Sequence, residues 1–350
     1  MSITTAVFGT LSDGRTVTKY TIENANGTTL ALLDYGAYIQ SICVKDKHGI
    51  RRDVTVGFDD ADGFEHRTDY QGAAAGPYAN RIGGGMFTID GVTYDLEKNE
   101  KGVTTLHGCG EYNKTLWTAQ ILGDNSVAMR YLRPDGLHGY PGAINAVITY
   151  TLTDNDRISI KYDCVSDKKT FMNPTDHTYF NLGGYDSGDI LSHSLTLYSS
   201  RYTPVDENSI PTGACAPVAD TPFDFTTTKK IGDEIDADNE QLRFTGGYDH
   251  NFCIDGADGS LKKAAEAICA DTGIRLTVYT TLPGIQFYAG NFLCGVPGKG
   301  SLPMEKRTGF CLETQYYPDT PNHPAFPSCL FNAGEHYTSE TVYAFDTVSD

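Results

Sequence analysis

The stretch AVITYTLTDNDRISIKY, residues 146–162, decides the class of fold predicted for this chain. Two runs of alternating β-branched, aromatic and polar residues, 146–152 and 157–162, flank the polar segment 153–156. Side chains of a β-strand point alternately to opposite faces, and Asn and Asp favour tight turns. The stretch therefore predicts an antiparallel β-hairpin.

Two further stretches repeat this organisation. Residues 86–94, MFTIDGVTY, place Asp90-Gly91 between two strand-like runs, and this dipeptide supplies the positive φ angles of a type I′ turn. Residues 260–269, SLKKAAEAIC, have the composition of a helix. The Thr272-Gly273 turn and the strand-like run 274–279 that follow favour a hairpin instead, so we predict a strand there.

The whole chain shows short strand-like runs separated by turn residues. Helical periodicity is scarce, and 22 Tyr and 16 Phe provide large apolar side chains. The prediction is an all-β fold, a large antiparallel β-sandwich. Length alone allows one large domain or two ordinary ones. No internal repeat or linker divides the chain, so we expect a single domain over residues 1–350.

Charge narrows the classes of partner. The formal net charge is -18, from 45 acidic and 27 basic residues, and no run of Lys and Arg could follow a phosphate backbone. Nucleic acid and anionic membranes are therefore not expected as partners, and a neutral small-molecule substrate fits best. The sequence does not indicate an oligomeric state.

Signals of export and of a metal centre are also missing from the sequence. The N-terminal residues lack the basic and apolar regions of a signal peptide, and no apolar run approaches the roughly 20 residues that span a bilayer. Nine cysteines occur without a C-x-x-C pair, which suits neither a disulfide framework nor a structural zinc site. We expect a cytoplasmic protein with reduced thiols and no metal.

Six short segments combine polar side chains with aromatics or glycines, as in a site built on the loops and strands of a sandwich. The signatures G-x-x-x-x-G-K-[ST], G-x-G-x-x-G, G-x-S-x-G and H-E-x-x-H are absent. The segments are residues 76–85, 105–110, 171–184, 246–252, 283–291 and 310–324. Their candidate functional residues are Asn80, Arg81, His107, His177, Asp249, Gln286 and Glu313.

Most of these residues also have an ordinary structural explanation. Arg81 suits a surface loop, Asp249 suits a turn, and a solitary histidine such as His107 is more often a core or surface residue than a catalyst. Gln286 suits a solvent-facing position on a strand, and Glu313 suits an exposed ion pair. If Glu313 is instead desolvated, its pKa rises and it can act as a base near neutral pH.

One of the six segments indicates a kind of ligand, and another contains a possible nucleophile. In residues 171–184 a His, an Asp and two Asn lie among aromatic rings, a combination that suits the binding of sugar hydroxyls. In residues 105–110, Cys109 beside His107 is a conceivable nucleophile, but we find no orienting base or oxyanion donors to accompany it. The cysteine nucleophile is therefore not favoured.

Taken together and in this order, the six segments resemble the aldose 1-epimerase (galactose mutarotase) family from about residue 76 to residue 328. Trp117 and the segments 134–136, 139–142 and 202–213 add further family-like features. The resemblance implies a galactose mutarotase-like β-sandwich with a sugar-binding cleft and no metal or organic cofactor. The resemblance also implies which residues of this chain form the active site.

The catalytic glutamate of the family falls on Glu313, its acid histidine on His177 and its second site histidine on His107. Its sugar-binding positions fall on Asn80, Arg81, Asp249 and Gln286. Three positions depart from the family pattern, since the family commonly has Arg, Asn and Gly where this chain has Pro77, Asp176 and Cys109. These departures leave the fine shape of the cleft, and with it the preferred hexose, undetermined by the sequence.

The implied activity is interconversion of the α and β anomers of a free hexose, galactose or glucose. Ionised Glu313 would remove the C1 hydroxyl proton and protonated His177 would deliver a proton to the ring oxygen. His107 would polarise the ring oxygen or hold the opened chain, while Arg81 and Asp249 fix the hydroxyl pattern. The alternatives are a hexose-6-phosphate 1-epimerase, a non-catalytic sugar-binding protein and a hydrolase with two carboxylates.

Overall fold

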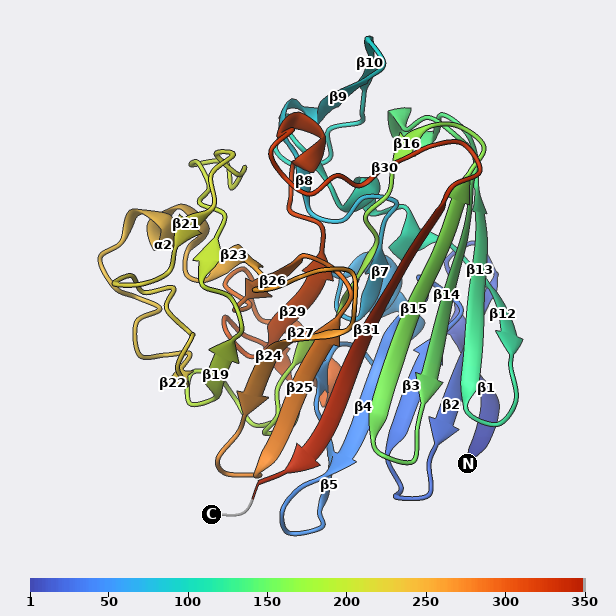
Figure 1. The fold of residues 1–350 in the computed structure, drawn as a ribbon. Coiled ribbons are helices and arrows are strands. Elements are labelled where there is room, and N and C mark those ends of the chain that lie inside the picture. Colours follow the sequence, from blue (N-terminus) through green and yellow to red (C-terminus); the bar gives the residue numbers. More distant parts are fainter. Residues whose placement is uncertain (349–350) are drawn as a thin grey trace.

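The computed structural model describes residues 1–348, and its framework consists of three antiparallel β-sheets (Figure 1). The largest sheet has nine strands. In spatial order they are β12 (Thr118–Ile121), β13 (Ser126–Arg133), β14 (Ile144–Leu152), β15 (Arg157–Ser166), β31 (His336–Thr347), β25 (Ile274–Thr280), β24 (Lys262–Ile268), β19 (Ser194–Leu197) and β22 (Lys229–Lys230).

The second sheet has seven strands and the third has five. The seven-stranded order is β21 (Ala216–Pro217), β20 (Arg201–Tyr202), β23 (Asp249–Cys253), β26 (Gly284–Tyr288), β29 (Phe310–Gln315), β18 (Tyr179–Phe180) and β6 (Thr55–Val56). The five-stranded order is β1 (Ser2–Thr10), β2 (Thr16–Glu23), β3 (Thr29–Leu33), β4 (Ile39–Lys45) and β5 (Arg51–Asp53).

One principal hydrophobic core joins the three sheets. Ile42 of β4, Ile148 of β14 and Phe287 of β26 all belong to it and are almost completely buried. Full burial of a side chain of this size stabilises a fold by about 1.5–3 kcal/mol. The alternating apolar residues seen in the sequence therefore form the inner faces of a sandwich, and the predicted all-β antiparallel sandwich is confirmed.

Short strand pairs and helical turns complete the chain. The pairs are β7 (Ala73–Ala75) with β17 (Thr175–His177), β8 (Arg81–Ile82) with β11 (Thr105–Leu106), β9 (Met86–Ile89) with β10 (Val92–Asp95), β16 (Thr170–Phe171) with β30 (Leu330–Phe331), and β27 (Val296–Pro297) with β28 (Pro303–Met304). The helices are α1 (Ala61–His66) and α2 (Glu240–Thr245), and the 3-10 turns are η1 (Gly83–Gly85), η2 (His107–Gly110), η3 (Tyr112–Lys114), η4 (Leu137–Gly139), η5 (Lys299–Ser301) and η6 (Thr320–Asn322). Within residues 1–348 no helix is long and apolar enough to cross a membrane.

The predicted hairpins are present. β14 and β15 pair with Leu152 opposite Ile158, and in β9–β10 the turn residues Asp90 and Gly91 have φ angles of 50° and 82°. The Ala-rich segment forms strand β24, paired with β25, and the strand prediction there is confirmed. Its three alanines are buried in the core, so tertiary packing prevails over helix propensity.

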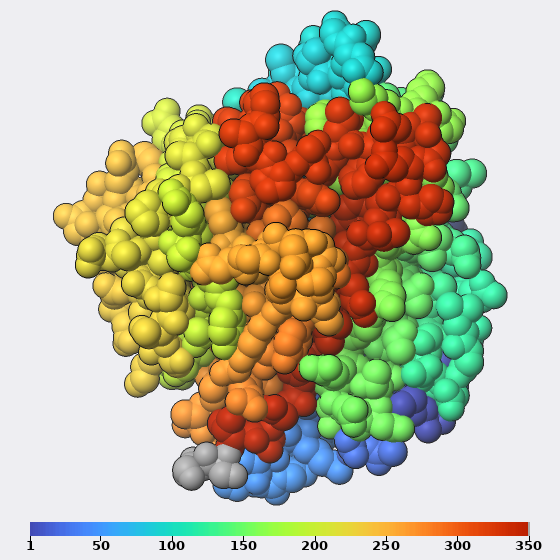
Figure 2. Space-filling view, in the orientation of Figure 1, coloured from blue at the N-terminus to red at the C-terminus, as the bar shows by residue number. Residues whose placement is uncertain are grey.

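The last strand, β31, lies in the middle of the largest sheet. It pairs with β15 on one side and β25 on the other, so it joins segments that are far apart in the sequence. Figure 2 shows the same arrangement from outside, with red C-terminal residues between green and orange ones. The two halves of the nine-stranded sheet are therefore joined by β31.

Candidate active site

Neighbouring strands of the seven-stranded sheet place polar side chains on one face. Glu313 of β29 lies opposite Gln286 of β26, which lies opposite Asn251 of β23. Asp249, two residues before Asn251, shares this face because side chains alternate along a strand. All four side chains are buried, so their polar atoms need partners within the protein.

A hydrogen-bond network supplies several of these partners. Nε2 of Gln315 donates to Oε1 of Gln286 at 3.1 Å, and Nε2 of Gln286 donates to Oδ1 of Asp249 at 2.6 Å. Arg81 approaches from another strand pair. Its guanidinium donates to both carboxylate oxygens of Glu100 at 2.9 and 2.8 Å, and its Nη1 lies 3.8 Å from Oδ2 of Asp249. Gln286 and Arg81 together orient the Asp249 carboxylate.

Glu313 also faces a histidine from a separate strand pair. His177 is the last residue of β17, and its Nε2 lies 3.6 Å from Oε2 of Glu313. Both side chains are buried, and Oε2 of Glu313 has no hydrogen-bond partner within the described residues. On the other side of the ring, Nδ1 of His177 lies 3.6 Å from Sγ of Cys311. A buried oxygen that lacks a partner calls for a functional explanation, and this one faces an imidazole.

His107 lies beside this pair in the turn η2. Its ring centroid is 5.1 Å from that of His177, and the two rings meet edge to face. The backbone N–H of Asn80 donates to Nδ1 of His107 at 3.2 Å, which leaves the proton of a neutral ring on Nε2. Burial, followed by the neighbouring His177 and Arg81 charges, lowers the pKa of His107 well below its usual range. His107 is therefore a neutral hydrogen-bond donor.

Burial determines the protonation of the Glu313–His177 pair. Burial raises the pKa of Glu313 well above its usual value, and the Asp249 carboxylate adds to this effect. Burial also lowers the pKa of His177 to about 4. Burial therefore favours the neutral form of each group, whereas the mechanism implied by the family resemblance begins with ionised Glu313 and protonated His177. The pair holds one proton in either form.

These side chains line one cavity of about 440 Å³. Of the predicted site residues, Asn80, Arg81, His107, His177, Asp249 and Glu313 line it. Gln286 lies behind Asp249 and does not. The sequence analysis did not single out the other lining residues, which are Asp69, Tyr70, Glu100, Lys101, Leu106, Tyr179, Ser209, Phe244, Tyr288 and Phe292. Tyr179 and Tyr288 stand in segments already quoted for their aromatics, whereas Tyr70 stands in none.

The three departures from the family pattern lie outside the cavity lining. Asp176 points into the core, where its Oδ1 accepts a hydrogen bond from the Tyr343 hydroxyl at 3.1 Å. Pro77 is buried behind the lining and its carbonyl accepts the N–H of Asn173. None of these three side chains therefore lines the cavity directly.

Cys109 is not arranged as a nucleophile. Its thiol donates to the backbone carbonyl of Glu97 at 3.2 Å, and burial with the nearby Glu97 and Glu111 charges raises its pKa to about 12. The Nδ1 atom of His107 already accepts a backbone hydrogen bond and offers no base to the thiol. The alternative of cysteine catalysis therefore has no structural support.

A metal ion is the next possibility for this cluster. Potential ligand atoms of His107, His177 and Glu313 lie within 4.8 Å of one another. The Asn80 hydrogen bond to Nδ1 of His107, however, leaves an N–H rather than a lone pair on the other ring nitrogen. The arrangement suits hydrogen bonding to a substrate oxygen better than metal ligation.

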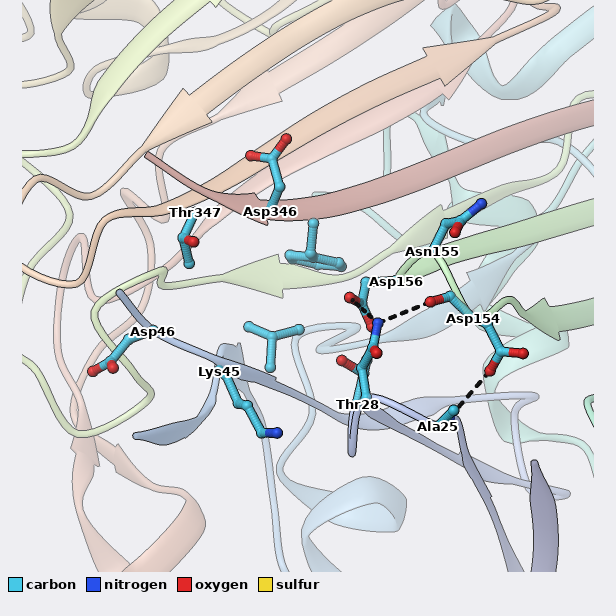
Figure 3. Close-up of a pocket in the computed structure, with 12 residues that line it drawn as sticks. Ala25, Thr28, Lys45, Asp46, Asp154, Asn155, Asp156, Asp346 and Thr347 are labelled. Atoms are coloured by element: carbon cyan, nitrogen blue, oxygen red, sulfur yellow. Dashed lines mark hydrogen bonds between the residues drawn. The ribbon is translucent and has the colours of Figure 1, made fainter. Parts of the chain in front are cut away.

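A second cavity, of about 750 Å³, lies where β4, the β14–β15 turn and β31 end (Figure 3). Four aspartates line it, but their carboxylates serve the local structure. Asp154 accepts the backbone N–H of Ala25, Asp156 accepts from Asn24 and Asn26, Asp46 accepts from Arg52, and Asp346 accepts from Arg275. None of the predicted site residues is present, so the smaller cavity is the candidate active site.

Comparisons with known proteins agree with this site. A family model described as aldose 1-epimerase matches residues 18–344. The galactose mutarotase of Rattus norvegicus is 40% identical over 348 residues and 99% of each chain is covered. The aldose 1-epimerase of Escherichia coli strain K12 is 39% identical over 336 residues, covering 95% of this chain and 96% of its own. A GalM/aldose epimerase homologue from C. elegans has a TM-score of 0.86 at 30% identity, covering 94% of this chain and 98% of that one.

The sandwich fold and its cleft place the chain in the class of galactose mutarotase-like β-sandwich proteins. Sequence similarity over nearly the whole length makes the assignment narrower. The chain belongs to the aldose 1-epimerase family, and it is an isomerase that interconverts the anomers of an aldose. The predictions of family, fold and enzyme class are confirmed.

Proposed function

We propose that this enzyme acts on free hexoses such as galactose and glucose, and that Glu313 and His177 carry the two proton transfers. The observation that supports this assignment most strongly is the buried contact of 3.6 Å between Nε2 of His177 and Oε2 of Glu313. The two proton-carrying atoms lie next to each other in the lining of the cavity that a sugar ring would enter. Anomerisation exchanges protons at two neighbouring oxygens, the C1 hydroxyl and the ring oxygen, and a facing pair matches that need.

The two protonation forms of the pair correspond to two halves of one cycle. With Glu313 ionised and His177 protonated, the pair removes the C1 hydroxyl proton and protonates the ring oxygen, so the C1–O5 bond breaks. The products are the open-chain aldehyde, neutral Glu313 and neutral His177. After rotation about the C1–C2 bond the same transfers run in reverse, and the ring closes on the other face of the carbonyl.

Burial favours the neutral pair, which is the form that matches the open-chain aldehyde. In that form Glu313 donates to the carbonyl oxygen and His177 accepts from the C5 hydroxyl. The neutral Glu313–His177 pair therefore reduces the free-energy gap between the bound ring form and the bound open-chain form of the sugar. The site does not have to create a new charge when the ring opens. Proton transfers of this kind typically contribute about 10²–10⁴-fold to a rate.

The remaining residues of the cavity position the sugar. Because Nδ1 of His107 accepts the Asn80 N–H, the Nε2–H is the donor that His107 can offer to the ring oxygen. Arg81 and Asp249, which lie 3.8 Å apart, offer a donor and an acceptor to neighbouring hydroxyls of a pyranose. Gln286 acts from behind by holding Asp249. Asn80 holds His107 through its backbone and is a further candidate contact to the sugar.

The charge of the cavity supports a neutral sugar over a hexose phosphate. Its lining includes the carboxyl groups of Asp69, Glu100, Asp249 and Glu313 but only Arg81 and Lys101 as cations. Arg81 already binds Glu100 on two atoms. Two relatives named galactose mutarotase, from rat and human, support galactose as one of the substrates.

We further propose that residues 1–350 form a single domain that works in the cytoplasm without an organic cofactor. One core joins all three sheets, and β31 connects distant segments within one sheet. All nine cysteines are free, which suits a reducing compartment.

Polarimetry tests the substrate class. Freshly dissolved α-galactose, α-glucose and glucose 6-phosphate should be followed with and without the enzyme. We expect faster mutarotation of the two free hexoses and little change with the phosphate. Acceleration of the phosphate alone would identify a hexose-6-phosphate 1-epimerase, and no acceleration with any of the three would leave a sugar-binding protein.

A further inference from the structure

Three side chains from separate segments meet next to the sugar cleft but outside its lining. Glu97 follows β10, Cys109 lies in η2, and His138 lies in η4. Nδ1 of His138 lies 2.6 Å from Oε2 of Glu97, and Sγ of Cys109 lies 3.2 Å from the Glu97 carbonyl oxygen. One potential ligand atom from each residue lies within 4.8 Å of the other two.

We propose that Glu97, Cys109 and His138 form a binding site for Zn²⁺. Carboxylate, thiolate and neutral imidazole are three kinds of side chain that bind zinc in proteins, so zinc binding here releases to solvent the Cys109 thiol proton and the proton between His138 and Glu97. With bonds of about 2.0–2.3 Å, two ligands of a tetrahedral zinc ion lie roughly 3–4 Å apart, which matches this cluster after small side-chain movements. The Glu97 side chain is 60% exposed, so solvent leaves room for that movement.

The backbone around the cluster holds two of the ligands in place. Cys109 and His138 both have left-handed backbone conformations, with φ angles of 64° and 50°. Such conformations cost about 1–3 kcal/mol in residues other than glycine and persist only where the surrounding structure imposes them. The N–H of Glu97 donates to the His138 carbonyl at 3.1 Å, and the Thr105 hydroxyl donates to the Glu97 carbonyl at 2.7 Å. The three segments are therefore tied together before any ion binds.

The proposed zinc site leaves a coordination position for water. Glu97 is exposed, and Cys109 and His138 are partly exposed, so the ion can enter from solvent. Three protein ligands and one open position match the coordination of exchangeable zinc rather than of a closed structural site. Cys109 also lies two residues after His107 in the turn η2, so the zinc site and the sugar cleft share one turn of backbone.

Cobalt provides a direct test, because Co²⁺ occupies tetrahedral zinc sites and shows a thiolate charge-transfer absorption only when a cysteine is a ligand. The full-length enzyme should be titrated with Co²⁺ and then with Zn²⁺, in the presence and absence of saturating galactose. We expect one equivalent of Co²⁺ to produce the thiolate band, Zn²⁺ to abolish it, and galactose to leave it unchanged.

Variants identify the residues that bind the metal ion. Loss of a hydrogen-bond partner behind a metal ligand already weakens binding by about 10–100-fold, so we expect Cys109→Ser and His138→Ala to weaken Zn²⁺ binding by at least about 100-fold. Cys294→Ser, which removes an exposed cysteine elsewhere, serves as the matched control and should bind normally. Circular dichroism verifies that each variant is folded.

Two results would overturn the proposal. One is a titration without a thiolate band, or with a band that survives in folded Cys109→Ser. The other is binding that galactose displaces and that Glu313→Gln abolishes, because the ion would then occupy the His107, His177 and Glu313 cluster instead.

Discussion

Asp176 allows a quantitative prediction of how a buried carboxyl group makes the free energy of unfolding depend on pH. It lies between the sheets, where Oδ1 accepts from the Tyr343 hydroxyl at 3.1 Å and from the Thr178 N–H at 3.2 Å, while Oδ2 has no partner among the described residues. Burial raises its pKa from 3.8 to about 7. The folded protein therefore holds a proton there that the unfolded chain releases above about pH 4.

The sign and size of the effect follow from this difference in pKa. Because the folded state binds more protons, the free energy of unfolding falls as the pH rises from about 4 to about 7 and levels off above that. A shift from 3.8 to about 7 at about 1.36 kcal/mol for each pKa unit amounts to about 4 kcal/mol. Asp176→Asn cannot ionise, so the variant lacks this loss of stability.

Urea unfolding of the wild type and Asp176→Asn at several pH values between 4.5 and 8.5 measures the difference. We expect the free energy of unfolding of the variant, minus that of the wild type, to rise by about 3 kcal/mol over this range, because about 1 kcal/mol of the full effect is already present at pH 4.5. The exposed Asp124→Asn serves as a control and should show no such trend. A difference for Asp176→Asn that stays constant across this range would refute the reasoning.

Three further predictions concern positions around the cleft. Glu111 accepts from Nε of the completely buried Arg133 at 2.9 Å, so Glu111→Ala should lower the free energy of unfolding by about 3–5 kcal/mol in urea titrations. Gln286→Leu removes the 2.6 Å hydrogen bond to buried Asp249, so KM for galactose should rise by roughly tenfold in polarimetry and the free energy of unfolding should fall by about 1–3 kcal/mol. Gly108 has a φ of 58°, and an added Cβ would lie 2.2 Å from the backbone oxygen of Gly76, so Gly108→Ala should reduce kcat for galactose at least tenfold in polarimetry. For each of the three variants, values unchanged from the wild type would contradict the account.

Local features of the fold could be predicted from the sequence, because hairpins depend on neighbouring residues. The β14–β15 hairpin and the Asp90-Gly91 turn are examples. The position of β31 between β15 and β25 could not be predicted, because pairing such as that of Ile158 with Tyr343 leaves no local pattern. The helix-like composition of β24 shows the same limit, since only packing against the core decides its conformation.

For the site, residue types and order could be predicted through the family resemblance, but geometry could not. Glu313 and His177 are far apart in the sequence, and only the structure shows that they meet. Burial raises the pKa of Glu313 and lowers that of His177, and burial cannot be read from a single sequence. The inward direction of the Asp176 side chain could have been predicted from the position of His177. Neighbouring residues on a strand point to opposite faces, and His177 faces the cleft. Tyr70 lines the cavity without any sequence motif to mark it.

The proposed acid–base pair is tested most directly by the galactose mutarotation rate of Glu313→Gln, measured by polarimetry, with sugar binding measured by calorimetry. Glutamine keeps the shape of the side chain but cannot exchange the proton, so the account predicts a loss of about 10²–10⁴-fold in kcat with galactose binding retained. Glu340→Gln, on β31 outside the cavity lining, should keep wild-type activity. A rate for Glu313→Gln within a few-fold of the wild type would contradict the central claim.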